Sequence, residues 1–137
     1  MKIMFSWKIS EEFVFPYCTS DNLNKDDISI LSCLLMDDGG IPYIQSIPWI
    51  QKGIEKIDSV VNGKAKSASW DREAWGALIT INGAKIYSLF EEDYFEEITL
   101  EQLRIALISW MNFIKTRPEH GKSEEIELQV ISIQFAA

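Results

Sequence analysis

A β-hairpin is predicted by the stretch Trp75-Gly-Ala-Leu-Ile-Thr-Ile-Asn82-Gly83-Ala-Lys-Ile-Tyr-Ser-Leu-Phe90, in which an Asn-Gly pair separates two runs of β-forming residues. A two-residue type I′ turn requires a positive φ at both central positions, and Asn followed by Gly meets that requirement well. We therefore expect antiparallel strands at about 75–81 and 84–90, joined by a turn at Asn82-Gly83.

An acidic stretch follows this hairpin. Residues 91–101 contain six acidic residues and no basic residue, in a chain whose formal net charge is −8. Acids just ahead of a helix favour its dipole, by a few tenths of a kcal/mol each when exposed. Glu91, Glu92 and Asp93 are expected at the end of a strand, however, outside the first helical turn. Two interpretations stay open: helix initiation, and a surface that attracts a cationic partner.

Length and composition indicate one globular domain, residues 1–137, with 47% hydrophobic and 25% charged residues. Apolar runs fall far short of the ~20 residues of a membrane span, and the N-terminus lacks a signal-peptide cleavage site. We therefore expect a cytoplasmic protein without membrane contact. A pI near 4.6 disfavours direct nucleic-acid binding and favours a basic partner.

Further strands are indicated by alternation of apolar and polar residues. Residues 1–9 alternate between an apolar face and a mainly polar one, and 12–17 can form a second short strand that stops at Pro16. Part of the polar link at 65–70 can add an edge strand to the hairpin. Residues 126–135 alternate in two runs that are out of phase, which predicts a strand with a bulge near 130.

An amphipathic helix is predicted from Ser46 to Gly63, with Pro48 near its start. Its apolar residues recur at spacings of three and four, at Ile47, Ile50, Ile54, Ile57 and Val61. Gly53 inside this helix costs about 1 kcal/mol relative to alanine. Either a neighbour packs closely against Gly53, or the helix is locally weak.

A second helix is predicted over Thr99–Lys115. Thr99 and Gln102 have the spacing of a capping box, and Ile98 and Leu103 that of a hydrophobic staple. Residues 28–36 are compatible with a helix or a strand, and we favour a short buried helix that ends at Asp37-Asp38-Gly39-Gly40. The expected fold is α+β: an antiparallel sheet of four to six strands, with two main helices packed on it and a third short one.

No catalytic or metal-binding motif is present. Cys18 and Cys33 lie in apolar surroundings, and two buried thiols are favoured over a disulfide because no dense cysteine framework accompanies them. The single histidine, His120, lies in a polar loop without a nucleophile signature. The Asp37-Asp38 turn lacks the further ligands of a calcium loop. We therefore expect no cofactor, no metal and no enzymatic activity, and prefer a protein-binding module.

The middle of the chain, about residues 45–115, resembles small immunity proteins of bacterial polymorphic toxin and contact-dependent growth inhibition systems. The likeness is carried by a helix with Trp49-Ile50, the Asn82-Gly83 hairpin, the acidic corner Tyr87-Ser-Leu-Phe-Glu-Glu-Asp93, and a helix with Trp110 and Phe113. This resemblance implies an inhibitor that binds a cognate toxin domain and blocks its active site or substrate surface. Many such toxins are nucleases, which carry positive charge to hold phosphate.

The candidate partner-binding residues are those of the acidic corner with one acidic turn added: Glu91, Glu92, Asp93, Tyr94, Glu96, Glu97, Asp37 and Asp38. Aromatic residues bordered by charge are typical binding hot spots, which favours Tyr94. Phe95 is expected instead to fill the strand-to-helix corner from the core side. The alternative function is a small-ligand-binding domain or enzyme with a tryptophan-lined pocket between sheet and helices.

Overall fold

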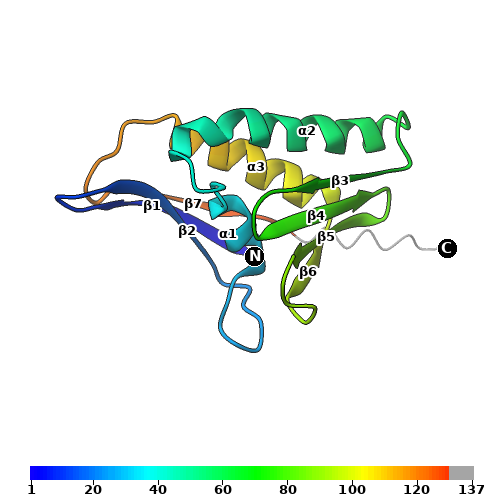
Figure 1. Cartoon of the computed structure of the whole chain (residues 1–137), viewed down its shortest axis with the longest axis horizontal. Helices are drawn as coiled ribbons and strands as arrows, with labels where there is room; N and C mark the ends of the chain where they lie inside the picture. Colours follow the sequence, from blue (N-terminus) through cyan, green and yellow to red (C-terminus); the bar gives the residue numbers. More distant parts are fainter. Residues whose placement is uncertain (130–137) are drawn as a thin grey trace.

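The computed structural model describes residues 1–129, which form two antiparallel sheets and three α-helices (Figure 1). The α+β class expected from the sequence is confirmed. In chain order the elements are β1 (Lys2–Ile9), β2 (Val14–Ser20), α1 (Ile30–Met36), the short 3-10 helix η1 (Tyr43–Ser46), α2 (Ile47–Val61), β3 (Ser67–Asp71), β4 (Trp75–Thr80), β5 (Gly83–Ser88), β6 (Phe95–Ile98), α3 (Leu100–Ile114) and β7 (Ser123–Glu127).

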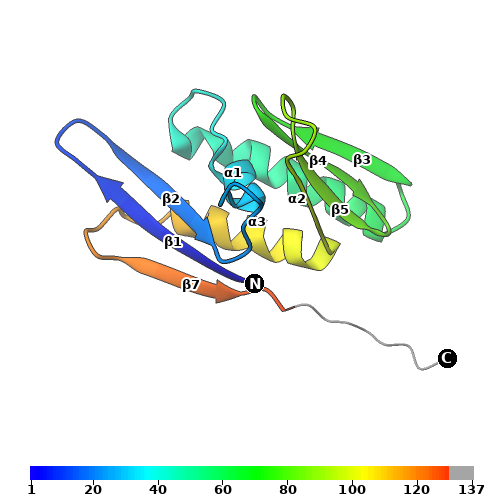
Figure 2. The same ribbon diagram turned by 90° about the horizontal axis from the view of Figure 1, so that it is seen from below.

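The strands divide between two sheets, where the sequence suggested one. The first sheet has the order β2-β1-β7 and the second the order β3-β4-β5-β6. Figure 2 shows the two sheets on opposite sides of α1. Both sheets contribute to one hydrophobic core, in which Phe113 of α3 packs against the rings of Phe5 and Trp7, at centroid distances of 5.6 and 5.0 Å.

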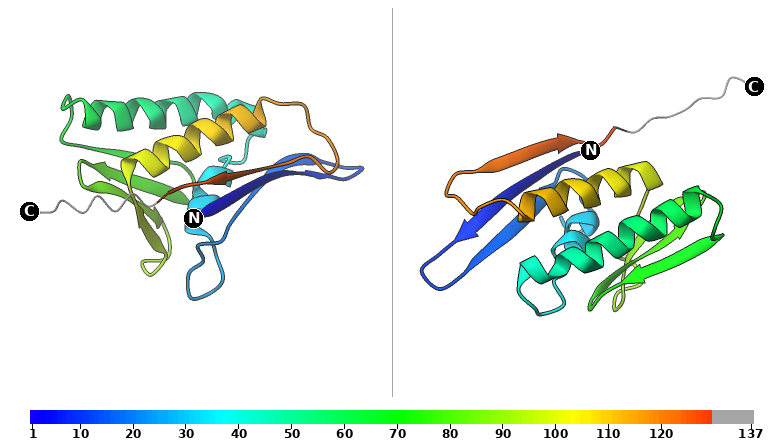
Figure 3. Two further views of the ribbon diagram at one scale, coloured as in Figure 1. Left: turned by 180° about the vertical axis from the view of Figure 1, so that it is seen from behind. Right: turned by 90° about the horizontal axis from the view of Figure 1, so that it is seen from above.

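The two long helices lie side by side along the molecule, as both views of Figure 3 show. An ion pair joins them where Arg104 Nε lies 2.8 Å from Asp58 Oδ1. The predicted start of α3 is confirmed: Thr99 is the N-cap, and it forms a reciprocal capping box with Gln102. On α2 the core position near the C-terminus is Val60, whereas Val61, expected on the core face, is exposed.

The hairpin is confirmed, but its turn differs from the one predicted. Thr80 pairs with Gly83, so the two loop residues are Ile81 and Asn82, and Asp27 is the one described non-glycine residue with positive φ. The predicted type I′ turn at Asn82-Gly83 is therefore wrong. Gly83 has φ 139°, and a β-carbon there would lie 2.8 Å from the Ile98 carbonyl oxygen. The glycine is required by the close approach of β6, outside the turn itself.

Strand β2 continues through Pro16 to Ser20, so the predicted stop at Pro16 is wrong. Pro16 lies opposite Trp7 in an edge strand, and an edge strand tolerates a proline whose missing N–H would face away from the sheet. The short helix favoured for 28–36 is confirmed as α1, with Ser29 as its N-cap. The edge strand expected at 65–70 is confirmed as β3.

Two further expectations concern the ends of the chain and its cysteines. Strand β7 begins at Ser123, three residues earlier than predicted, and the predicted bulge near 130 lies outside the described residues. Cys18 and Cys33 are free thiols, as expected, but Cys18 alone is buried, whereas Cys33 is half-buried. His120 is exposed in a turn.

Candidate functional site

The acidic corner forms a tight loop, residues 89–94, between β5 and β6; we call it the acidic loop. The Ser88 hydroxyl accepts hydrogen bonds from the N–H groups of Phe90 and Glu91, at 3.1 and 3.0 Å. The Ser88 N–H donates to the Tyr94 carbonyl, and the Tyr94 N–H to the Glu91 carbonyl. These contacts close the loop on itself, and the side chains of residues 89–93 are exposed.

Three of the predicted acids lie in this loop, and all three are exposed: Glu91, Glu92 and Asp93. Asp93 forms an ion pair with Lys25 at 3.4 Å, in which both side chains are largely exposed. Exposed pairs of this kind contribute little stability, because water and salt screen them. Glu91 and Glu92 form no ion pair within residues 1–129. The loop therefore presents largely uncompensated negative charge.

Tyr94 closes the acidic loop and connects it to the segment before α1. Its hydroxyl donates a 2.5 Å hydrogen bond to the Asp26 carboxylate. That hydrogen bond is the main cause that raises the pKa of Tyr94, with smaller contributions from desolvation and from the nearby carboxylates of Asp26, Glu91 and Asp93. Tyr94 thus remains a protonated donor that anchors the loop.

Glu96 points back into the protein, unlike the other acids of the corner. Its carboxylate accepts hydrogen bonds from Asn22 Nδ2 and, at 3.3 Å, from the Leu31 N–H. Desolvation by burial raises the pKa of Glu96, and the two hydrogen bonds offset part of that rise. The structure therefore places Glu96 as a link between β6, the loop before α1 and the start of α1.

Phe95 lies on the outer side of β6 and is 47% exposed, so the expectation that it fills the core is wrong. The chain forms a strand before α3 begins, and alternation along a strand sends Phe95 and Glu97 to one face and Glu96 and Ile98 to the other. Lys85 Nζ lies over the Phe95 ring, 4.7 Å from its centroid. Phe95 and Glu97 thus share the solvent-facing side of the second sheet.

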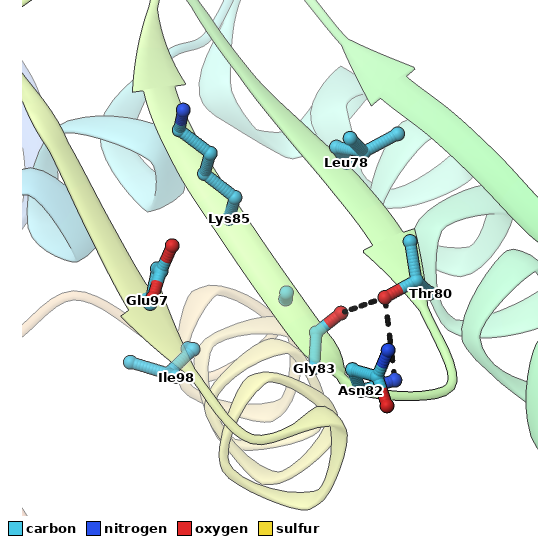
Figure 4. Close-up of a pocket in the computed structure, with 8 residues that line it drawn as sticks. Leu78, Thr80, Asn82, Gly83, Lys85, Glu97 and Ile98 are labelled. Atoms are coloured by element: carbon cyan, nitrogen blue, oxygen red, sulfur yellow. Dashed lines mark hydrogen bonds between the residues drawn. The ribbon is translucent and has the colours of Figure 1, made fainter.

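This outer sheet face is formed by Leu78, Lys85, Tyr87, Phe95 and Glu97, which strand pairing places in adjacent rows. Two shallow hollows lie on it. One, of about 460 Å³, is lined by Leu78, Lys85, Tyr87, Ser88 and Glu92, so it reaches the acidic loop. The other, of about 280 Å³, extends from Leu78 and Lys85 toward Glu97 and the Thr80–Gly83 turn (Figure 4).

The two remaining predicted residues, Asp37 and Asp38, follow α1. Asp37 Oδ2 accepts hydrogen bonds from the N–H groups of Ala74 and Trp75, at 2.9 and 3.1 Å. The Ala74 carbonyl in turn accepts one from the Leu89 N–H at 2.9 Å. The turn is thereby connected to the acidic loop. Asp37 itself is committed to internal hydrogen bonds, whereas Asp38 is exposed.

Sequence reasoning missed the most exposed large apolar side chain of this region, Phe90, which is 77% exposed in the acidic loop beside the half-exposed Leu89. Both residues were counted as part of the hairpin strand. Strand pairing stops at Ser88, which is paired with Trp75, and frees the two residues beyond it. The sequence signal that indicates their exposure is their position directly before the run of acidic residues.

Within residues 1–129, no group of three His, Cys, Asp or Glu side chains is arranged to hold a metal ion. None of the described helices combines the length and the apolar character needed to cross a bilayer. Comparison with protein-family models, curated proteins and solved structures finds no match to this chain.

Proposed function

We propose that this protein is an immunity protein that binds a cognate bacterial toxin domain, a cationic nuclease, and neutralises it by covering its active site or substrate surface. The observation that carries the proposal is the acidic loop, in which a 77% exposed phenylalanine, Phe90, is followed directly by three exposed acidic residues, Glu91, Glu92 and Asp93. The proposed site of action is the cytoplasm of the toxin-producing cell.

The anatomy of the loop supports a protein partner. Hot spots of protein interfaces are typically apolar or aromatic anchors that become fully desolvated, inside a polar or charged rim. Phe90 and Leu89 supply the anchor, and Glu91, Glu92 and Asp93 supply the rim. A large apolar side chain that is 77% exposed next to like charges stabilises the free protein little, since most of its surface stays in water and the charges repel one another.

The charge of the loop indicates the kind of partner. Like charges gathered on one surface attract an oppositely charged protein and raise its association rate, and this effect falls as salt is added. A nuclease carries positive charge to bind phosphate. An acidic inhibitor with an apolar anchor therefore matches the substrate surface of such an enzyme, and the outer sheet face extends the area available for contact.

The alternative, a ligand-binding domain or enzyme with a tryptophan-lined pocket, has weaker support. One hollow in residues 1–129 is lined by a tryptophan, Trp110. The volume of that hollow is about 220 Å³. Small-molecule sites usually measure ~300–1,000 Å³. Trp49 and Trp70 instead stack on each other, with ring centroids 4.0 Å apart. We propose a binding role without catalysis.

The test is co-purification of the tagged protein from its native host in moderate salt, with mass spectrometry of the bound proteins. We expect one basic toxin domain. A triple variant of the acidic loop, E91K/E92K/D93K, is expected to lose this partner. The control, E119K/E124K/E125K, makes the same change in net charge at exposed positions around β7 and is expected to retain it. Equal retention by both variants would contradict the proposal.

A further inference from the structure

A separate hollow of about 220 Å³ lies at the outer edge of β2, between this strand, α1, η1 and α3. Four aromatic residues contribute to its lining: Phe15, Tyr17, Tyr43 and Trp110. Asp38 is the one charged residue among the lining residues, which include no lysine or arginine. By strand alternation the side chains of Phe15 and Tyr17 lie on the face of β2 opposite the buried Pro16, so the rings on the core side of the hollow are those of Tyr43 and Trp110. The hollow combines these two rings with a single carboxylate.

The backbone at this edge offers hydrogen-bond acceptors. The Ser10 N–H donates to the Phe13 carbonyl, so by antiparallel alternation Val14, Pro16 and Cys18 direct their backbone groups away from β1. Pro16, which lines the hollow, has a carbonyl but no N–H. The Cys18 N–H already donates to Met36 Sδ at 3.3 Å. A ligand beside Pro16 therefore meets an acceptor and needs a donor of its own.

Two cations of the protein lie at the margin of the hollow without lining it. Lys8 Nζ lies 4.6 Å from the centroid of the Tyr17 ring. Arg72 donates from Nη1 to the Ser46 hydroxyl at 3.0 Å and lies over the Trp49 ring. Both are held by contacts of their own, outside the lining of the hollow. Neither of them neutralises Asp38 by an ion pair within residues 1–129.

We propose that this hollow binds the guanidinium or ammonium group of one arginine or lysine side chain of the partner. Aromatic faces attract a cation through their quadrupole, Asp38 supplies the opposite charge, and the Pro16 carbonyl accepts a hydrogen bond. The volume is below that of usual small-molecule sites and suits one side chain. That the side chain belongs to a basic protein rests on the proposed function; the preference for a cation does not.

The position of the hollow fits a second contact of the same partner. Asp38 follows Asp37, which is joined through Ala74 to Leu89 of the acidic loop. A protein that covers Phe90 can therefore reach the rim of the hollow. The acidic loop would provide the apolar anchor, and the hollow would hold one long cationic side chain.

The test needs no partner protein, because the probes are free amino-acid derivatives. N-acetyl-arginine amide is titrated into the ¹⁵N-labelled protein, and the indole N–H resonance of Trp110 is followed by NMR. N-acetyl-citrulline amide, which has nearly the same shape and no charge, is the matched probe. We expect saturable binding of the arginine derivative, at least about tenfold tighter than binding of the citrulline derivative.

Variants locate the site. D38N keeps the oxygen that accepts the 2.8 Å hydrogen bond from the Gly40 N–H, removes the charge, and is expected to abolish the preference for arginine. E55Q removes an exposed carboxylate from α2 and is expected to change nothing. Equal binding of both probes, or an arginine preference unchanged in D38N, would overturn the proposal. If the hollow failed this test but the protein still captured a basic toxin, the proposed function would remain supported.

Discussion

Gly53 of α2 lies directly beneath the indole of Trp70 in β3: a β-carbon at position 53 would come within 2.6 Å of Trp70 Cε2. Trp70 is held there by a hydrogen bond from its Nε1 to the Trp49 carbonyl, at 2.9 Å, and by stacking on the Trp49 ring. The sequence left two explanations for a glycine inside this helix, and close packing is the one that the structure supports. The second sheet is joined to α2 through this contact.

Gly53→Ala is expected to destabilise the protein, although alanine is the better helix former by about 1 kcal/mol. The added methyl group overlaps a buried ring, and overpacking of this kind usually costs about 1–3 kcal/mol. Urea unfolding measures the net change. Gln51→Ala, at an exposed position of the same helix, is the control and is expected to change stability little. A G53A protein as stable as the wild type would contradict the close contact.

Asp37→Ala is expected to destabilise the protein by about 1–3 kcal/mol, because it leaves the Ala74 and Trp75 N–H groups without their acceptor. Asp37→Asn keeps one carboxamide oxygen and is expected to cost less. Glu73→Ala, at an exposed neighbouring position, serves as the control in the same urea titrations. If D37A and E73A proved equally stable, Asp37 would have no structural role.

Glu96 should make stability depend on pH in a defined direction. Burial raises its pKa in the folded state above the value of about 4.3 for an unfolded glutamate, so the folded protein binds a proton more readily. Its contribution to the free energy of unfolding is fully present below the unfolded pKa and is lost as pH rises through the folded pKa.

The stability of the wild type relative to Glu96→Gln should therefore fall as pH rises from about 4 through the raised pKa. Urea unfolding at a series of pH values measures this difference. A parallel series with Glu97→Gln is the control. It shows how much of the change of stability with pH arises from removing any carboxylate from β6. A difference that grows with pH would mean that the hydrogen bonds of Glu96 outweigh its burial.

The two cysteines are expected to react slowly in the folded protein. Burial raises the pKa of Cys18 to about 12, although its hydrogen bond to Ser32 acts in the opposite direction, and burial also raises the pKa of Cys33. Because the thiolate is the reactive form, alkylation at pH 8 should be slow and should reach the half-buried Cys33 first. Mass spectrometry follows the labelling, and urea-unfolded protein gives the reference rate. Rapid labelling of Cys18 in native protein would contradict its burial.

Phe90→Ala is expected to leave stability within about 0.5 kcal/mol, since the side chain is mostly exposed. If Phe90 is the anchor for the toxin, the same variant should weaken toxin binding at least tenfold, mostly through faster dissociation. Phe13→Ala, at a 54% exposed phenylalanine near the β1–β2 turn, is the control. Surface plasmon resonance with the captured partner measures both rates. Equal binding by the two variants would remove Phe90 from the interface.

Local signals in the chain were sufficient for much of the fold. The capping box of Thr99 and Gln102 and the alternation of residues 1–9 each depend on neighbours in sequence, so they predict α3 and β1 correctly. The β4–β5 hairpin was predicted for the same reason, although its turn was placed one residue too late. The concentration of acids after β5 likewise identified the acidic loop.

Contacts between distant segments decided the rest. The division into two sheets depends on β7 pairing with β1, more than a hundred residues away in the chain. The pairing of β6 with β5 decided the directions of Phe95 and Glu96, because neighbouring residues of a strand face opposite sides of the sheet. An acidic run of residues carries no local signal for that choice. Which acids stay available to a partner is therefore set by strand pairing and burial.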